Sequence, residues 1–119
     1  GNGACRMADV EQLRFRRGVM SLVVLALLER EDMYGYQLVE EVSKRSGGLI
    51  TTQEGSLYPV LYKLEDAGLI SSRKIPVGKR RQRILYHLEP AGTQQLREMV
   101  AEYRSVVQGV FMIIGEEHE

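Results

Sequence analysis

The periodicity of the apolar residues changes twice along this chain, and these changes limit the folds that the chain can adopt. Apolar residues recur at helical spacing before Gly68, alternate with other residues between Leu69 and Leu88, and return to helical spacing after Pro90. Helical spacing places an apolar stripe on one face of a helix, whereas alternation is typical of a half-buried strand. The sequence therefore predicts a mainly α fold with a small β-hairpin.

Three helical segments precede the hairpin. We expect the first over Val10–Arg30, with an apolar second half that is buried on most sides. The second is expected from about Tyr34 to Arg45, where a pair of glycines ends it. The third is predicted within Thr51–Ala67, where Gly68 ends it. This arrangement leaves only short loops between the helices.

The start of the third helix has two alternatives. Thr51 and Glu54 could form a capping box, but Pro59 would then lie in the helix interior, at a cost of about 3 kcal/mol. A later start, with Ser56 as the cap, would place Pro59 in the first turn, where backbone N–H groups have no helical partner. The sequence does not choose between these starts.

The hairpin is predicted from two strands over Leu69–Ile75 and Gln82–Leu88, joined by Pro76–Arg81. Pro90 suits the first position of a last helix. The apolar residues of this helix, spaced alternately three and four apart, form a heptad seam made of Leu96, Met99, Tyr103, Val106, Val110 and Ile113. Neighbouring apolar residues widen this seam, so we expect the helix to pack against a second subunit as well as its own domain.

The charges are distributed unevenly, although the 16 basic and 16 acidic side chains of the 119-residue chain cancel. Residues 54–88 contain seven basic and three acidic groups, whereas residues 89–119 contain two basic and six acidic groups. A basic middle segment gives a neutral protein a local positive surface for phosphate. The charge pattern therefore favours double-stranded DNA as a partner.

Three helices followed by a hairpin match a winged helix-turn-helix, in which one helix enters the major groove and the hairpin, or wing, reaches the DNA backbone. The third helix is the predicted recognition helix, because Leu57, Leu61 and Leu64 form its inward stripe. The predicted DNA-binding residues in and before this helix are Tyr34, Ser56, Tyr58, Pro59, Tyr62 and Lys63. The predicted DNA-binding residues of the wing, residues 76–83, are Lys79, Arg80, Arg81 and Arg83. Hydroxyl groups and cations are the side-chain groups that bind phosphates and base edges.

Each of these assignments has a simpler alternative. Tyr58 and Tyr62 could be half-buried residues at the edge of the core, and a basic turn could be a solvated loop. Arg14, Arg16 and Arg17 are better explained as a solvated helix face than as DNA contacts. The fold itself also occurs in modules that bind protein instead of DNA, and such a module is the alternative function.

Other functional classes find little support. His87 and His118 are the only histidines, and neither they nor Cys5 show the spacing of a metal site or a nucleophile with its base. We therefore predict neither an enzyme nor a metal or other cofactor. The apolar run Val19–Leu28 is about half of the roughly 20 residues that cross a bilayer. We expect a cytoplasmic protein that does not bind membranes.

A series of short motifs, taken in order, resembles the PadR-like family of regulators. The residues that carry the resemblance are Tyr34–Leu38, Glu54–Leu61, Leu64, Glu65, Gly68–Ile70, Arg83, Tyr86, Leu88 and Gly92. The resemblance implies a transcriptional regulator, usually a repressor, that dimerises through its C-terminal helix and responds to small aromatic or drug-like compounds. The single helix after the wing is similar to the small subfamily.

The chain also departs from the family pattern. Ile84 and Leu85 replace a common Lys-Tyr pair, Glu89 replaces a Thr before the last helix, and no Trp is present for an effector pocket. These differences concern the ligand more than the DNA-binding fold.

The complete prediction is a homodimer that presents two recognition helices to a near-palindromic operator, with half-sites ~34 Å apart. Residues 1–8 are expected to be a disordered tail or foreign to the native chain, residues 9–89 the DNA-binding domain, and residues 90–119 the dimerisation helix of the same compact unit. A small hydrophobic effector would bind between the subunits. The residues predicted to line its pocket are Val23, Leu27, Tyr103 and Val107.

Overall fold

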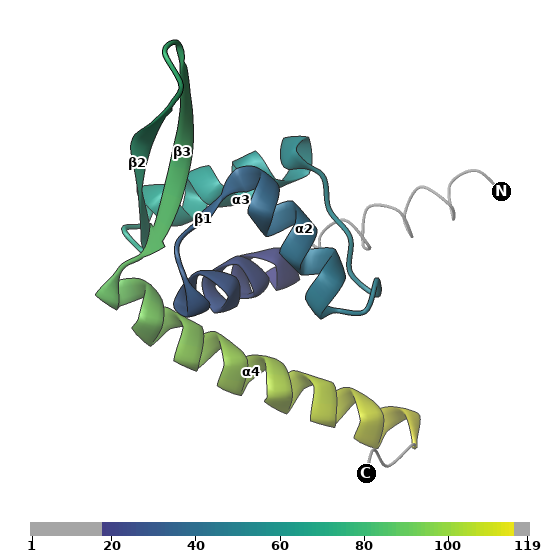
Figure 1. The fold of residues 1–119 in the computed structure, drawn as a ribbon. Helices are drawn as coiled ribbons and strands as arrows, with labels where there is room; N and C mark the ends of the chain where they lie inside the picture. The colour runs from purple at the N-terminus through teal and green to yellow at the C-terminus, as the bar shows by residue number, and fades with distance from the viewer. Residues whose placement is uncertain (1–17, 116–119) are drawn as a thin grey trace, which may run out of the picture.

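A computed structural model describes residues 18–115 of the chain (Figure 1). An N-terminal helix covers residues 18–30, and β1 (Met33–Tyr34), α2 (Gly35–Arg45), α3 (Glu54–Asp66), β2 (Ile70–Val77), β3 (Arg81–Leu88) and α4 (Pro90–Ile114) follow. The predicted mainly α fold with a small antiparallel sheet is confirmed. The predictions for residues 1–8, for a helix start at Val10 and for Arg14, Arg16, Arg17, Cys5 and His118 lie outside the described residues.

The sheet contains one strand more than the predicted hairpin. β1 pairs with β3, and β3 pairs with β2, which gives the antiparallel order β1-β3-β2. Met33 lies opposite Tyr86, and Tyr34 lies opposite Leu85. Our sequence analysis placed Tyr34 at the start of a helix, but it is the N-cap residue of α2 and also the end of β1. A strand of two residues is too short to show alternation, so pairing with β3 was needed to define it.

The start of α3 corrects both predicted alternatives. Gln53 is the N-cap and Glu54 the first helical residue, so neither Thr51 nor Ser56 caps the helix. Pro59 lies inside α3, beyond the first turn. The helix continues through it because residues on both sides of Pro59 belong to the buried core. Pro59 also leaves the carbonyl of Gly55 without its usual helical donor, but Gly55 is exposed, so water can supply one.

The wing is longer and its turn tighter than predicted. The strands continue to Val77 and resume at Arg81, so the turn consists of residues 78–80 instead of the six residues 76–81. Gly78 has a φ of 80°, a conformation that glycine adopts without steric strain. Pro76 pairs with Gln82 within β2, which is an edge strand and therefore tolerates the missing N–H group.

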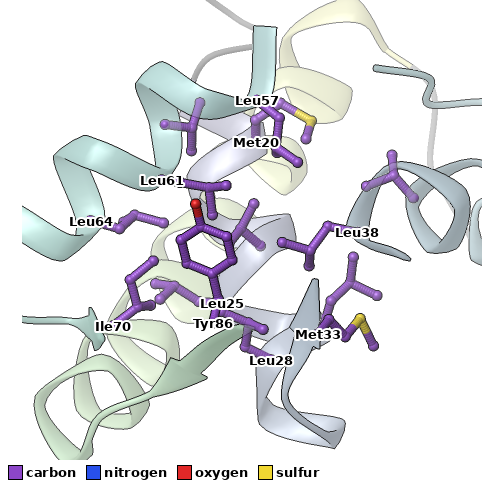
Figure 2. Packing of buried hydrophobic residues seen from close by; sticks show 14 of the residues in the cluster. Met20, Leu25, Leu28, Met33, Leu38, Leu57, Leu61, Leu64, Ile70 and Tyr86 are labelled. Atoms are coloured by element: carbon purple, nitrogen blue, oxygen red, sulfur yellow. The ribbon is translucent and has the colours of Figure 1, made fainter. Parts of the chain in front are cut away.

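The core lies where the N-terminal helix, α2 and α3 meet the base of the sheet (Figure 2). Figure 2 shows the ring of Tyr86 surrounded by Leu25, Leu61, Leu64 and Ile70. The wing extends away from this core in Figure 1, so side chains nearer its tip are less buried. On β3, for example, Tyr86 is 3% exposed whereas Ile84 is 42% exposed. The alternating apolar residues of β3 are therefore buried only near the base of the wing.

The last helix begins at Pro90, as predicted, and its first turns pack on the core. Gly92 faces the carbonyl of Leu69 so closely that a Cβ atom at position 92 would overlap it. Leu96 is buried, and Met99 packs against the core. Beyond this point α4 extends away from the rest of the described chain (Figure 1). No helix within residues 18–115 is both long enough and apolar enough to cross a membrane.

Candidate nucleic-acid interface

The outer face of α3 carries the side chains that the sequence singled out for DNA contact. We call Ser56, Tyr58, Pro59, Tyr62 and Lys63 the reading face, and all five are exposed. The buried residues Leu57, Val60, Leu61 and Leu64 hold the opposite side of α3 in the core. The rings of Tyr58 and Tyr62 are tilted neighbours, with centroids 6.5 Å apart. Tyr62 is 66% exposed, so it is not a core-edge residue.

The cations of the wing are also exposed. We call Lys79, Arg80, Arg81 and Arg83 the wing cations, and among the described residues none of them forms an ion pair. The base of the hairpin differs, because the Asp32 carboxylate forms an ion pair with Arg73 at 3.6 Å and accepts a hydrogen bond from Nδ1 of His87 at 2.7 Å. Positive charge near the body of the protein is thus partly neutralised, whereas charge toward the tip is not.

A hollow of about 700 Å³ separates the reading face from the base of the wing. Its lining consists of Tyr34, Gly35, Tyr36, Glu54, Tyr58, Gln82, Arg83, Ile84 and Tyr86. The hollow thus joins residues from β1, the start of α2, the first half of α3, and β3 both beside β1 and beyond it. The hydroxyl of Tyr58 reaches across to Gly35, where a Cβ atom would lie 3.7 Å from it. α3 and the wing therefore open on one shared surface.

Tyr36 is a member of this surface that our sequence analysis missed. Its ring stacks on Tyr34, with centroids 5.8 Å apart and planes 8° apart, and the guanidinium carbon of Arg83 lies 4.6 Å from its centroid. Tyr36 belongs to the run 34–38 that we used for the family resemblance, but nothing in that run indicates a wing arginine as its partner. The contact depends on β3 returning beside β1, which is a tertiary feature.

Tyr86 forms the floor of the hollow and has a perturbed hydroxyl. Burial, with smaller contributions from the nearby Tyr58, Glu65 and Tyr62, raises the pKa of Tyr86 to about 12. Glu65 also accepts a hydrogen bond from the hydroxyl of Ser72, which ties α3 to β2. The Tyr86 phenol is therefore neutral at physiological pH, and it serves as a packing residue beneath the exposed tyrosines.

The predicted dimer seam is divided between the core and the surface. Leu96 is 4% exposed and lies in the core of its own domain. The later residues form what we call the apolar α4 face. Its members are Tyr103, Val106, Val110 and Ile113, which are 42%, 57%, 49% and 86% exposed. This face, rather than Leu96, is what a second subunit could cover.

The predicted effector pocket is not tested by a single subunit. Leu27 is buried in the core, Val23 packs against that core, and Tyr103 and Val107 lie further along α4. The hollow at the base of the wing has a different lining. The effector pocket therefore stays a prediction. Within residues 18–115, no group of three His, Cys, Asp or Glu side chains could hold a metal ion.

Three helices followed by a basic hairpin define a winged helix-turn-helix protein, in which α3 is the helix with the exposed polar face. Residues 24–98 match the model of the transcriptional regulator PadR-like family. The chain belongs to this family of transcriptional regulators.

Named relatives agree with this assignment. The chain is 33% identical over 84 residues to the transcriptional regulator YqjI of Escherichia coli, a match covering 71% of this chain and 39% of YqjI. It is 25% identical over 92 residues to the negative transcriptional regulator PadR of Bacillus subtilis, covering 77% of this chain and 50% of PadR. The chain therefore spans half or less of the length of these two relatives.

Solved structures show the same fold. A PadR family transcriptional regulator from Eggerthella lenta has a TM-score of 0.77 at 29% identity, over 96% of this chain and 97% of that chain. The structure of Bacillus subtilis PadR in complex with operator DNA has a TM-score of 0.65 at 27% identity, over 69% of this chain and 46% of that chain.

Proposed function

We propose that this chain is a sequence-specific DNA-binding repressor that inserts α3 into the major groove of an operator and places the wing on the flanking backbone. One observation carries the proposal: Tyr58 of the reading face and Arg83 of the wing cations line the same hollow, so α3 and the wing lie beside one another. Exposed cations that form no ion pair among the described residues suit phosphates, and hydroxyl groups on an exposed helix face suit base edges and phosphates.

The comparisons support DNA binding and repression as the two main parts of this proposal. Bacillus subtilis PadR was solved with operator DNA and is described as a negative transcriptional regulator. The family model matches residues 24–98, which contain α2, α3 and the wing of this chain. We assign no enzymatic reaction, because the relatives with named roles are regulators.

The proposal includes a homodimer built on α4. The apolar α4 face would be unusual on a monomer, because four large apolar side chains at heptad spacing are exposed on one helix. Pairing two copies about a two-fold axis would cover both faces at once. The two copies of α3 would then read half-sites ~34 Å apart in a near-palindromic operator.

Release from DNA is the last part of the proposal. A small aromatic or drug-like compound would bind between the subunits, near Val23, Leu27, Tyr103 and Val107. Because α4 carries the dimer contact, a ligand there would change the separation of the two recognition helices. Its binding would lower operator affinity without contacting DNA.

DNA binding is tested first by fluorescence anisotropy, with a labelled duplex taken from the promoter that precedes the coding region and a scrambled duplex as control. We expect tighter binding to the promoter duplex, and a steep loss of affinity when the salt concentration is raised. A module that binds protein instead would show weak binding that is equal for both duplexes. That result, repeated with duplexes tiled over neighbouring promoters, would refute the proposal.

A further inference from the structure

We infer that Tyr36 is a positioning residue for DNA binding: its ring carries the guanidinium of Arg83 and holds it at the hollow, ready for one backbone phosphate. This inference rests on the proposed function, because it assigns a role within the same DNA-binding surface. The partner is a phosphodiester group of double-stranded DNA. The residue that makes the contact is Arg83, and Tyr36 acts through it.

Tyr36 is not part of the hydrophobic core. Tyr36 is 38% exposed and lies outside the hydrophobic core cluster, so packing alone does not account for an aromatic ring at this position. Its contacts are instead with Tyr34 on one element and Arg83 on another. The 4.6 Å from the Arg83 guanidinium carbon to the ring centroid is within the roughly 6 Å range of a cation–π contact.

The sheet is narrower beside the hollow. Within residues 18–115, β1 pairs only with Leu85 and Tyr86, so residues 81–84 of β3 have a strand neighbour on the β2 side but none on the β1 side. The hollow lies at this step in the sheet. The contact between Arg83 and Tyr36 connects this part of the wing to the start of α2, beyond the last β1 pair. It therefore fixes the wing relative to the helices.

An arginine can lie over an aromatic ring and still bind a phosphate. When the flat face of the guanidinium stacks on the ring, its N–H groups remain free to point outward in the plane. Those groups match the oxygens of a phosphate in a bidentate arrangement. A supported side chain also loses less rotamer freedom when it binds. Tyr36 thus prepares Arg83 for phosphate without occupying its donors.

The surroundings of Arg83 favour an anion on balance. The hydroxyl groups of Tyr34 and Tyr58 belong to side chains that line the same hollow and can donate to a phosphate. Glu54 lines the hollow as well, and its carboxylate would oppose an anion. Replacing Glu54 by Gln is therefore expected to raise DNA affinity. If Glu54 instead held the wing in place, the same substitution would lower DNA affinity.

The test is a double-mutant cycle on DNA affinity, measured by fluorescence anisotropy with the promoter duplex over a range of salt concentrations. We expect Arg83→Ala to weaken binding roughly tenfold and to reduce the salt slope by about one, because one phosphate contact is lost. We expect Tyr36→Leu to weaken binding roughly two- to fivefold. In the Tyr36→Leu background, Arg83→Ala should then cost clearly less than tenfold.

Two controls separate positioning from general structural damage. Tyr36→Phe keeps the ring and should bind nearly as wild type, whereas a direct hydroxyl contact with DNA would make it as weak as Tyr36→Leu. Arg97→Ala removes an exposed arginine from α4 and should leave the salt slope unchanged. Thermal melting checks each variant, and Tyr36→Gln provides a second ring-free substitution if Tyr36→Leu is unstable.

A phosphate scan gives a readout that a purely structural role would not change. Neutral methylphosphonates are placed one at a time along the duplex. One position should weaken wild-type binding but have little effect on Arg83→Ala, and its effect should shrink in Tyr36→Leu. Equal costs of Arg83→Ala in both backgrounds, or an unchanged salt slope, would overturn the inference while leaving the repressor proposal intact. Wild-type protein that shows no salt-sensitive binding would overturn both.

Discussion

The same substitution in α4, from glycine to alanine, should have opposite effects at two positions. At Gly109 no atom of the described residues outside the local helix backbone and the adjoining residues lies within 4 Å of the added Cβ atom, so the variant should gain about 1 kcal/mol of helix propensity. At Gly92 the Cβ atom would overlap the Leu69 carbonyl oxygen and lie 2.5 Å from Cδ1 of Leu88. Leucine 88 can rotate, but the Leu69 carbonyl is held by the N–H of Glu89 at 3.0 Å.

The magnitude at Gly92 follows from these contacts. Relief of the overlap requires the first turn of α4 to move, at an overpacking cost of about 1–3 kcal/mol. Loss of the hydrogen bond from the Glu89 N–H to the Leu69 carbonyl costs about 1 kcal/mol more. The higher helix propensity of alanine offsets about the same amount. Gly92→Ala should therefore lower the free energy of unfolding by about 1–3 kcal/mol.

Urea denaturation followed by circular dichroism measures both variants at one protein concentration. Gly92→Ala should shift the midpoint down and Gly109→Ala should shift it up or leave it unchanged. Repeating the Gly109→Ala measurement at a tenfold lower concentration shows whether a partner subunit contributes. Equal effects of the two substitutions would refute the reasoning, because only position 92 has a backbone obstacle.

Three further predictions concern the core, the wing and α4. The raised pKa of Tyr86 means that the unfolded state loses its proton first, so stability should fall by roughly 1.4 kcal/mol per pH unit between about pH 10 and 12; denaturation of Tyr86→Phe should lack that contribution. Replacing Lys79, Arg80 and Arg81 by Ala should reduce the salt slope of operator binding by roughly two to three, and an unchanged slope would refute the wing assignment. Val110→Glu should weaken dimerisation at least roughly tenfold in analytical ultracentrifugation, because it places a charge in an apolar interface; wild-type protein that is monomeric at micromolar concentration would contradict the dimer itself.

Most of the fold could be predicted because its elements have strong local signals. Leu57, Leu61 and Leu64 define the inward side of α3 by spacing alone, and each is buried. Pro90 marked the start of α4 for a reason local to the backbone. The exposed positions of the wing cations likewise followed from a run of charges in a turn. These features depend on residues near one another in sequence, where periodicity and capping rules apply.

The errors occurred where distant residues decide the outcome. Pro59 argues against a helix locally, but the core residues around it hold α3 in place. The seam of α4 looks uniform in the sequence, yet Leu96 is buried by its own domain while Ile113 is 86% exposed. A repeat in the sequence cannot show which of its turns the rest of the chain will cover.

The sequence by itself determined the order of the elements, the inward stripe of the recognition helix and the accumulation of charge in the wing. Each of these is set by local backbone preference and by the separation of apolar from polar side chains. Only the tertiary structure decided that β1 pairs with β3, that the Arg83 guanidinium lies over the Tyr36 ring, and that Tyr58 and Arg83 line one hollow. The physical reason is that these contacts join residues separated by many positions, so their geometry exists only after the sheet and helices have packed on a common core.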